Sequence, residues 1–138
     1  MAKERTAKDI MKTPVITVKE DNTVANAVKL MAHWKISGLP VVDDEGRLIG
    51  MVTGRLIMNT AVSGNAARTS VTEVMSKQLE IYGPVYSPST QVEELVIHFA
   101  SSRINRVLIV EDGRVVGIVS RIDIICEMDR IYSQFVMS

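Results

Sequence analysis

Apolar residues recur along this chain at two spacings, and stretches of the two kinds alternate in a fixed order. Alternating or continuous apolar runs predict strands at residues 15–18, 39–42, 48–53, 106–110 and 114–120. Apolar positions three and four residues apart predict helices that begin near Thr23 and Val92, with further helices over 55–60 and 121–132. Polar turns separate the paired strands at 43–46 and 111–113. The pattern predicts a mixed α/β fold.

The same order of elements occurs twice. Asp-Ile-Met at 9–11 and Glu-Val-Met at 73–75 each open a unit, and polar residues at Thr6 and Ser70 cap the short helical turn that follows. Each unit continues as strand, helix, strand, strand and helix. We therefore divide the chain into repeats 1–69 and 70–138, with the small and polar stretch 62–69 as their connector.

Composition narrows the class of protein. The chain has 138 residues, of which 46% are hydrophobic and 23% charged, so it is long and apolar enough to bury a core. Its formal net charge is zero, which gives no overall attraction to nucleic acid or to an acidic membrane. No apolar run approaches the roughly 20 residues of a membrane span, and the polar start does not resemble a signal peptide. We expect a cytoplasmic protein.

Few residues suit catalysis or metal binding. Cys126 is the single cysteine, which excludes an internal disulfide, and we expect it to be a small buried residue. His33 and His98 fall in helical patterns, where an exposed or edge position is expected rather than a role as ligand or base. Trp34 and Phe99 are expected to serve packing. We predict neither an enzyme nor a metal site.

Ser120 and Asp123 are the strongest candidate for binding chemistry. They stand where a strand ends and a helix begins, so a phosphate could lie near the Ser120 hydroxyl and the free N–H groups, while Asp123 accepts hydrogen bonds from sugar hydroxyls. The same Ser-x-x-Asp spacing is also that of a capping box, in which the two side chains merely start the helix. Both interpretations stay open on these residues alone, and the two roles can coexist.

With both repeats in view, the chain resembles a tandem pair of cystathionine-β-synthase (CBS) domains, a Bateman module, over about residues 7–132. The resemblance rests on Asp-Ile-Met at 9–11, on the segments 36–43 and 46–53, and on the segments 104–110 and 113–124. It implies two pseudo-twofold-related β-α-β-β-α repeats packed through three-stranded sheets, with clefts between the repeats. Members of this family commonly bind AMP, ADP, ATP or S-adenosylmethionine and act as sensors.

The resemblance also implies a set of ligand-binding residues. Ser120 and Asp123 would hold the phosphate side and the ribose, with Ile122 lining the pocket. The segment Lys12, Thr13, Pro14, Val15 and Ile16 would hold the adenine, and Ile36 and Ser37 would meet the base and sugar. Asn105 stands where the family often places a phosphate contact, and Arg106 and Arg121 are nearby cationic candidates.

The first repeat departs from this pattern. In matched register Thr53 takes the place of Ser120, but Leu56 takes the place of Asp123 and cannot hydrogen-bond a ribose. Extra residues around 78–84 in the second repeat could fill the second cleft, although Thr53 and Arg55 could still hold an anion. We therefore expect one nucleotide site.

The resulting functional hypothesis is a regulatory module that needs no cofactor. It would bind an adenosine-type ligand and transmit the bound state to a protein partner or through a homodimer, which members of the family commonly form. One alternative is a structural or protein-interaction module with no ligand. An enzyme built on this scaffold is another, and it would need a catalytic group that the sequence does not reveal.

Overall fold

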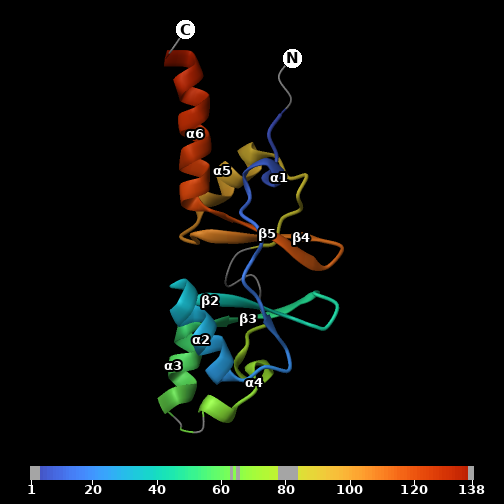
Figure 1. The fold of residues 1–138 in the computed structure, drawn as a ribbon. Coiled ribbons are helices and arrows are strands. Elements are labelled where there is room, and N and C mark those ends of the chain that lie inside the picture. Colours follow the sequence, from blue (N-terminus) through green and yellow to red (C-terminus); the bar gives the residue numbers. More distant parts are fainter. Residues whose placement is uncertain (1–3, 63, 65, 78–83, 137–138) are drawn as a thin grey trace. The chain divides into compact units, whose positions relative to one another are not determined.

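The computed structural model describes residues 4–62, 64, 66–77 and 84–136. They form two compact units that do not coincide with the two sequence repeats (Figure 1). One unit, here the Asp123 unit, contains residues 4–15, 84–112 and 116–136. The other, here the Trp34 unit, contains residues 16–62, 64, 66–77 and 113–115. Each sequence repeat thus contributes its opening segment to the unit that holds most of the other repeat.

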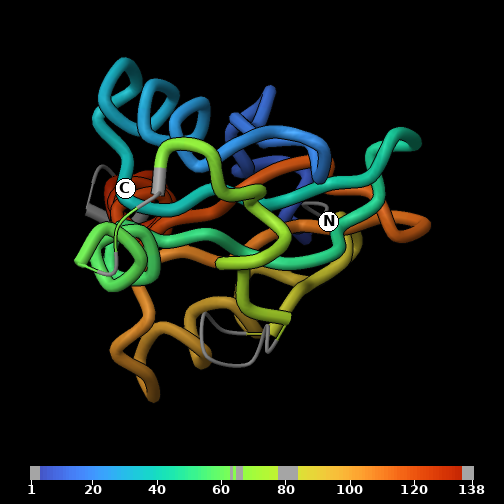
Figure 2. Tube along the Cα trace, turned by 90° about the horizontal axis from the view of Figure 1, so that it is seen from below, coloured from blue at the N-terminus to red at the C-terminus, as the bar shows by residue number. Residues whose placement is uncertain are grey.

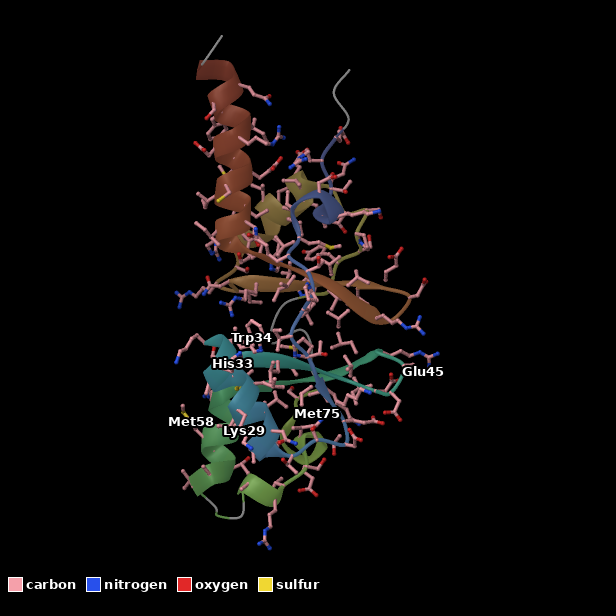
Figure 3. The ribbon with its side chains drawn as sticks, in the orientation of Figure 1. Lys29, His33, Trp34, Glu45, Met58 and Met75 are labelled. Carbon is pink, nitrogen blue, oxygen red and sulfur yellow. The ribbon has the colours of Figure 1, made fainter. Side chains whose placement is uncertain are left out.

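The Trp34 unit is built on a three-stranded sheet in the order β1-β2-β3. Its strands are β1 (Val18–Lys19), β2 (Gly38–Val42) and β3 (Leu48–Thr53). Strand β1 runs parallel to β2, with Val18 opposite Val41, and β2 pairs antiparallel with β3. The turn between β2 and β3, where Glu45 lies, is at the end of the sheet remote from α3 (Gly54–Val62) (Figures 1, 2 and 3).

That turn forms because the Asp43 carboxylate replaces missing backbone partners. Its Oδ1 accepts hydrogen bonds from the backbone N–H groups of Glu45 and Arg47, both at 2.9 Å, and Gly46 takes a φ of 81°. These bonds lower the pKa of Asp43. The predicted hairpin over 39–53 is confirmed.

The helices of the Trp34 unit start where the sequence offers capping side chains. Helix α2 (Val24–Trp34) begins after Thr23, whose hydroxyl accepts from the N–H of Asn26 at 3.2 Å. A 3-10 turn, η1 (Ala66–Arg68), occupies part of the predicted connector, and α4 (Val71–Val74) follows it. The buried core combines one face of α2 with the sheet, α3 and α4, and its residues are Val18, Val24, Ala27, Met31, Leu39, Val41, Val52, Ile57 and Val71.

The Asp123 unit repeats this plan. Its elements are α1 (Ala7–Ile10), α5 (Val92–Ser101), β4 (Arg106–Glu111), β5 (Arg114–Ser120) from residue 116 onward, and α6 (Arg121–Val136). Within the described ranges its sheet has two strands, β4 and β5, and the third strand that the resemblance implies is reduced to a parallel bridge between Tyr86 and Ile109. The core residues are Ala7, Val92, Leu95, Phe99, Val107, Ile109, Val119 and Ile124.

The N-terminal segment belongs to the Asp123 unit because its backbone is paired there. The N–H of Ala7 donates to the carbonyl of Thr90 at 2.7 Å, and Lys12 forms an antiparallel bridge with Ile118 in β5. The strand predicted over 15–18 is therefore shorter than expected. It begins only at Val18, after the chain has left the Asp123 unit.

Candidate ligand-binding site

Asp123 lies in the first turn of α6, directly after the end of β5. Its Oδ2 accepts hydrogen bonds from the backbone N–H of Ser120 at 2.8 Å and from the Ser120 hydroxyl at 2.9 Å. The N–H of Asp123 donates in return to the Ser120 Oγ at 3.4 Å. The Ser-x-x-Asp spacing thus forms the reciprocal cap that one of the two interpretations required. The Asp123 side chain is 9% exposed, so the carboxylate is held almost out of water.

The second oxygen of this carboxylate faces a cation. Lys12 Nζ lies 3.7 Å from Asp123 Oδ1, and the Lys12 side chain is 74% exposed. The lysine backbone is fixed on β5, because Lys12 N–H donates to Ile118 O at 2.9 Å and Lys12 O accepts from Ile118 N–H at 3.2 Å. The arrangement places one ammonium, one hydroxyl and one carboxylate together.

The predicted site residues are divided between the two units. Lys12, Thr13, Pro14, Val15, Asn105, Arg106, Ser120, Arg121, Ile122 and Asp123 lie in the Asp123 unit, whereas Ile16, Ile36 and Ser37 lie in the Trp34 unit. Within the Asp123 unit, Lys12, Ser120 and Asp123 are in direct contact. Ile122 is 63% exposed, so its side chain is not part of the core.

Arg121 has a structural role that sequence reasoning missed. Its guanidinium donates to the backbone carbonyls of Phe99, Ser102 and Ile104 at the end of α5, the last two at 3.0 Å. Its Nε donates to Asn105 Oδ1 at 3.2 Å, and its Cζ lies 5.4 Å from the centre of the Phe99 ring. Arg121 therefore provides hydrogen bonds both to the Asn105 side chain and to the carbonyl groups at the end of α5. Arg106 is exposed.

In the first repeat, Thr53 corresponds to Ser120 and caps a helix, but no carboxylate corresponds to Asp123. Thr53 Oγ1 accepts from the N–H of Leu56 at 3.3 Å at the start of α3. This bond matches the one between Ser120 and Asp123, but Leu56 offers no acceptor. Of the extra residues predicted to fill a second cleft, 78–83 lie outside the described residues.

A buried ion pair near the other end of the N-terminal segment was also missed. Glu127 on α6 is 4% exposed and accepts from Arg5 Nε at 3.0 Å and Arg130 Nη2 at 2.7 Å. Hydrogen bonds from Arg130 and Arg5 lower the pKa of Glu127 to about 2. The i,i+3 spacing of Glu127 and Arg130 was the available sequence signal, and the contact with Arg5 had none.

The cysteine and histidines offer little chemistry. The expectation that Cys126 is buried is wrong: it is exposed, because it lies on the solvent side of α6. His98 packs edge-on against Tyr86 and Phe99, and burial lowers its pKa. His33 is exposed, as expected. Among the residues that the structure describes, no three His, Cys, Asp or Glu side chains gather as a metal site. No helix in the described part of the chain is long and apolar enough to cross a membrane.

Comparison with known families identifies the class of protein. The sequence pattern of the CBS domain matches residues 7–62 and again residues 71–130. The chain therefore belongs to the CBS domain family and carries two copies of the domain.

Similar proteins agree with this assignment. The chain is 36% identical over 114 residues to the CBS domain-containing protein YhcV of Bacillus subtilis, covering 82% of this chain and 78% of YhcV. It resembles the crystal structure of CBSX2 in complex with AMP, with a TM-score of 0.74 and 25% identity, over 93% of this chain and 98% of the other. It also resembles the CBS domain pair of protein MJ0100 in complex with 5-methylthioadenosine and S-adenosyl-L-methionine, with a TM-score of 0.68 and 26% identity, over 96% and 98% of the two chains.

Some of the relatives are enzymes, but the chain matches only part of them. The chain is 33% identical over 120 residues to inosine-5'-monophosphate dehydrogenase from Methanocaldococcus jannaschii. The matched region covers 86% of this chain but only 23% of the enzyme. The enzyme's activity is therefore not transferred to this chain.

Proposed function

We propose that this protein is a regulatory module that binds an adenosine-type ligand through Ser120 and Asp123. The ligand class is AMP, ADP, ATP or S-adenosylmethionine, and the bound state is passed to a protein partner or through a homodimer. The proposal includes no catalytic step and no required cofactor, and it places the protein in the cytoplasm.

The observation that supports the proposal is the burial and hydrogen bonding of the Asp123 carboxylate. A carboxylate with a side chain only 9% exposed loses hydration, and Ser120 compensates one of its two oxygens fully. The other oxygen, Oδ1, is positioned to accept a hydrogen bond from a ribose hydroxyl. The positive end of the dipole of α6, a helix of 16 residues, favours a phosphate near this helix start, where the N–H groups of Arg121 and Asp123 already donate to Asn105 O and Ser120 Oγ.

The comparisons support the ligand class. CBSX2 was solved with AMP, and the MJ0100 domain pair with 5-methylthioadenosine and S-adenosyl-L-methionine. These ligands share an adenosine group and differ in what the 5' position carries. We propose that Lys12, Thr13, Pro14, Val15 and Ile16 hold the adenine, with Ile36 and Ser37 as further contacts and Ile122 at the rim. Of the two arginine candidates for the phosphate, Arg121 caps α5, so Arg106 is the one we propose to contact the phosphate.

Titration calorimetry with AMP, ADP, ATP and S-adenosylmethionine tests this proposal. At least one compound should bind, and Asp123→Asn should weaken it about ten- to a hundredfold, because a charge-assisted hydrogen bond to ribose is lost. Asp129→Asn is the matched control, since Asp129 is an exposed acid on the same helix. Equal affinity of wild type and Asp123→Asn for the ligand would show that Asp123 does not bind it.

The alternative function is an interaction module without a ligand. It is favoured by the complete cap between Ser120 and Asp123, which needs no ligand to satisfy it. If none of the four compounds binds, and none raises the melting temperature, Ser120 and Asp123 act as a helix cap and the alternative holds. A bound ligand at about 100 times its Kd should add about 2.7 kcal/mol.

We also propose that the module forms a homodimer through its helices. Met58 on α3 and Ile125 on α6 occupy matching positions in the two repeats and are 70% and 52% exposed. Figure 3 shows Met58 on the outer side of α3. Light scattering should give twice the mass of one chain, and Ile125→Lys should shift it toward one chain, because a desolvated lysine opposes association. Glu111→Lys, at the exposed end of β4, is the control.

A further inference from the structure

In the ion pair between Lys12 and Asp123, the lysine backbone is fixed but its ammonium is loosely held. The Lys12 backbone is paired with Ile118 in both directions, at 2.9 and 3.2 Å. Its Nζ lies 3.7 Å from Asp123 Oδ1, which is beyond hydrogen-bonding distance, and the side chain is 74% exposed. An ion pair of this kind is held weakly, so little is lost when it opens. The ammonium can move away from Oδ1, but the paired backbone of Lys12 keeps it within reach of the site.

The two oxygens of Asp123 are not equivalent. Oδ2 is committed to the N–H and the hydroxyl of Ser120. A ribose hydroxyl that donates to this carboxylate must therefore use Oδ1, which is the oxygen that Lys12 faces. A ribose hydroxyl bound at Oδ1 competes with Lys12 for this oxygen, so the ammonium becomes available to another anion nearby.

Arg121 cannot fill that role as readily, and Arg106 is exposed without a recorded contact to Asp123. Arg121 donates to three backbone carbonyls and to Asn105, so its charge is held at the end of α5. Without Lys12, a phosphate near Ser120 would approach the Asp123 carboxylate without the cation that faces this carboxylate in the free protein. Like charges at such distances disfavour each other, particularly where water is excluded.

We infer that Lys12 selects for phosphorylated adenosine: it pairs with Asp123 in the free protein and transfers to the phosphate of the bound ligand. The inference rests on the proposed function, because it concerns the same site. It makes Lys12 a specificity residue. A nucleoside without phosphate displaces Lys12 and gives it no partner, whereas AMP displaces it and supplies one.

Calorimetric titration with AMP and with adenosine tests the inference on wild type and on variants of Lys12 and Lys8. Wild type should prefer AMP. Lys12→Met should weaken AMP binding about ten- to a hundredfold and leave adenosine binding unchanged or stronger, because one charge-assisted bond to phosphate is lost and Oδ1 is freed. Lys12→Arg should keep the preference. Lys8→Met removes an exposed lysine from the same unit and should behave as wild type.

The outcomes separate this inference from the proposed function. If Lys12→Met weakens AMP and adenosine by the same factor, or changes neither, Lys12 does not select for phosphate and the inference is overturned while the proposed function stands. If wild type binds neither compound nor any other adenosine derivative, both are overturned. Circular dichroism of Lys12→Met should match wild type, and Lys12→Gln provides a second uncharged variant that must give the same change in preference.

Discussion

Met11 packs directly against the bare Cα of Gly117, so closely that a Cβ on Gly117 would clash with the Met11 side chain. Met75 has the same relationship to Gly50, where an added Cβ would lie 2.7 Å from the Met75 sulfur. Figure 3 labels Met75 in the segment that follows α4. Each short motif, Asp-Ile-Met and Glu-Val-Met, thus inserts a methionine against a glycine in the second strand of a hairpin. The glycines are required by packing.

The first prediction concerns Gly117. Gly117→Ala should lower the free energy of unfolding by about 1–3 kcal/mol, because the new methyl group overlaps Met11 and the surrounding core is closely packed. Urea denaturation monitored by circular dichroism measures the change. In the background of Met11→Ala, the same substitution should cost much less.

Gly38→Ala is the matched control for this prediction. A Cβ at Gly38 would have ordinary contacts at 3.9 Å from Val52 O and 4.0 Å from Met51 Cε. Its effect on the free energy of unfolding should stay within about 0.5 kcal/mol. Equal effects of Gly38→Ala and Gly117→Ala would show that the methionine contact is not what requires glycine.

Much of the local structure could be predicted from the sequence, because it depends on neighbouring residues. The turn at 43–46 and the helix start at Thr23 follow from side chains that replace backbone partners within a few residues. The repeat was visible from its two methionine motifs. The grouping of residues 4–15 with residues 84–112 and 116–136 was not, because it depends on backbone pairing between segments far apart in the chain.

The second prediction concerns the Glu127 ion pair and pH. The pKa of Glu127 falls from 4.5 to about 2 in the folded protein, so its pairing with Arg130 and Arg5 stabilises the fold fully above pH 4.5. This contribution should decline as the pH falls from about 5 toward 2. At pH 7, Glu127→Gln should lower the free energy of unfolding by about 2 kcal/mol, less than for fully buried pairs because the arginines are about 40% exposed.

Denaturation curves between pH 7 and pH 2 provide the measurement. The difference between wild type and Glu127→Gln should shrink as the pH falls and be close to zero near pH 2. Glu111→Gln, which changes an exposed carboxylate, should follow the wild-type curve. A difference of constant size over the whole range would contradict the assignment of the low pKa to Glu127.

The third prediction concerns His98. Burial and the Arg121 charge lower its pKa, so the folded protein holds this ring neutral where the unfolded chain takes up a proton. Stability should therefore fall as the pH drops below 6.5, by no more than about 1.4 kcal/mol per pH unit. His98→Phe should reduce this fall. His33→Phe, at an exposed histidine, should leave it unchanged, and an equal effect of both variants would rule out His98 as its source.

The candidate site was only partly predictable, for the same physical reason. Ser120 and Asp123 are three residues apart at a strand end, so their contact follows from the geometry of one helical turn. Lys12 was assigned to the adenine by resemblance, and nothing in its neighbours shows that its ammonium faces Asp123. That contact requires the N-terminal segment to pair with β5. Arg121 looked like a cation available for phosphate because the sequence does not show the three carbonyls that it binds.

The last prediction separates the two arginines that were candidates for a phosphate. Arg121→Met should lower the free energy of unfolding by about 2–4 kcal/mol, because the carbonyls of Phe99, Ser102 and Ile104 lose a shared charged donor. Arg106→Met should change it by less than about 0.5 kcal/mol, since Arg106 is exposed. Urea denaturation without ligand gives both values. An Arg121→Met protein as stable as wild type would mean that the guanidinium does not support the end of α5, and its charge would then be available to a ligand.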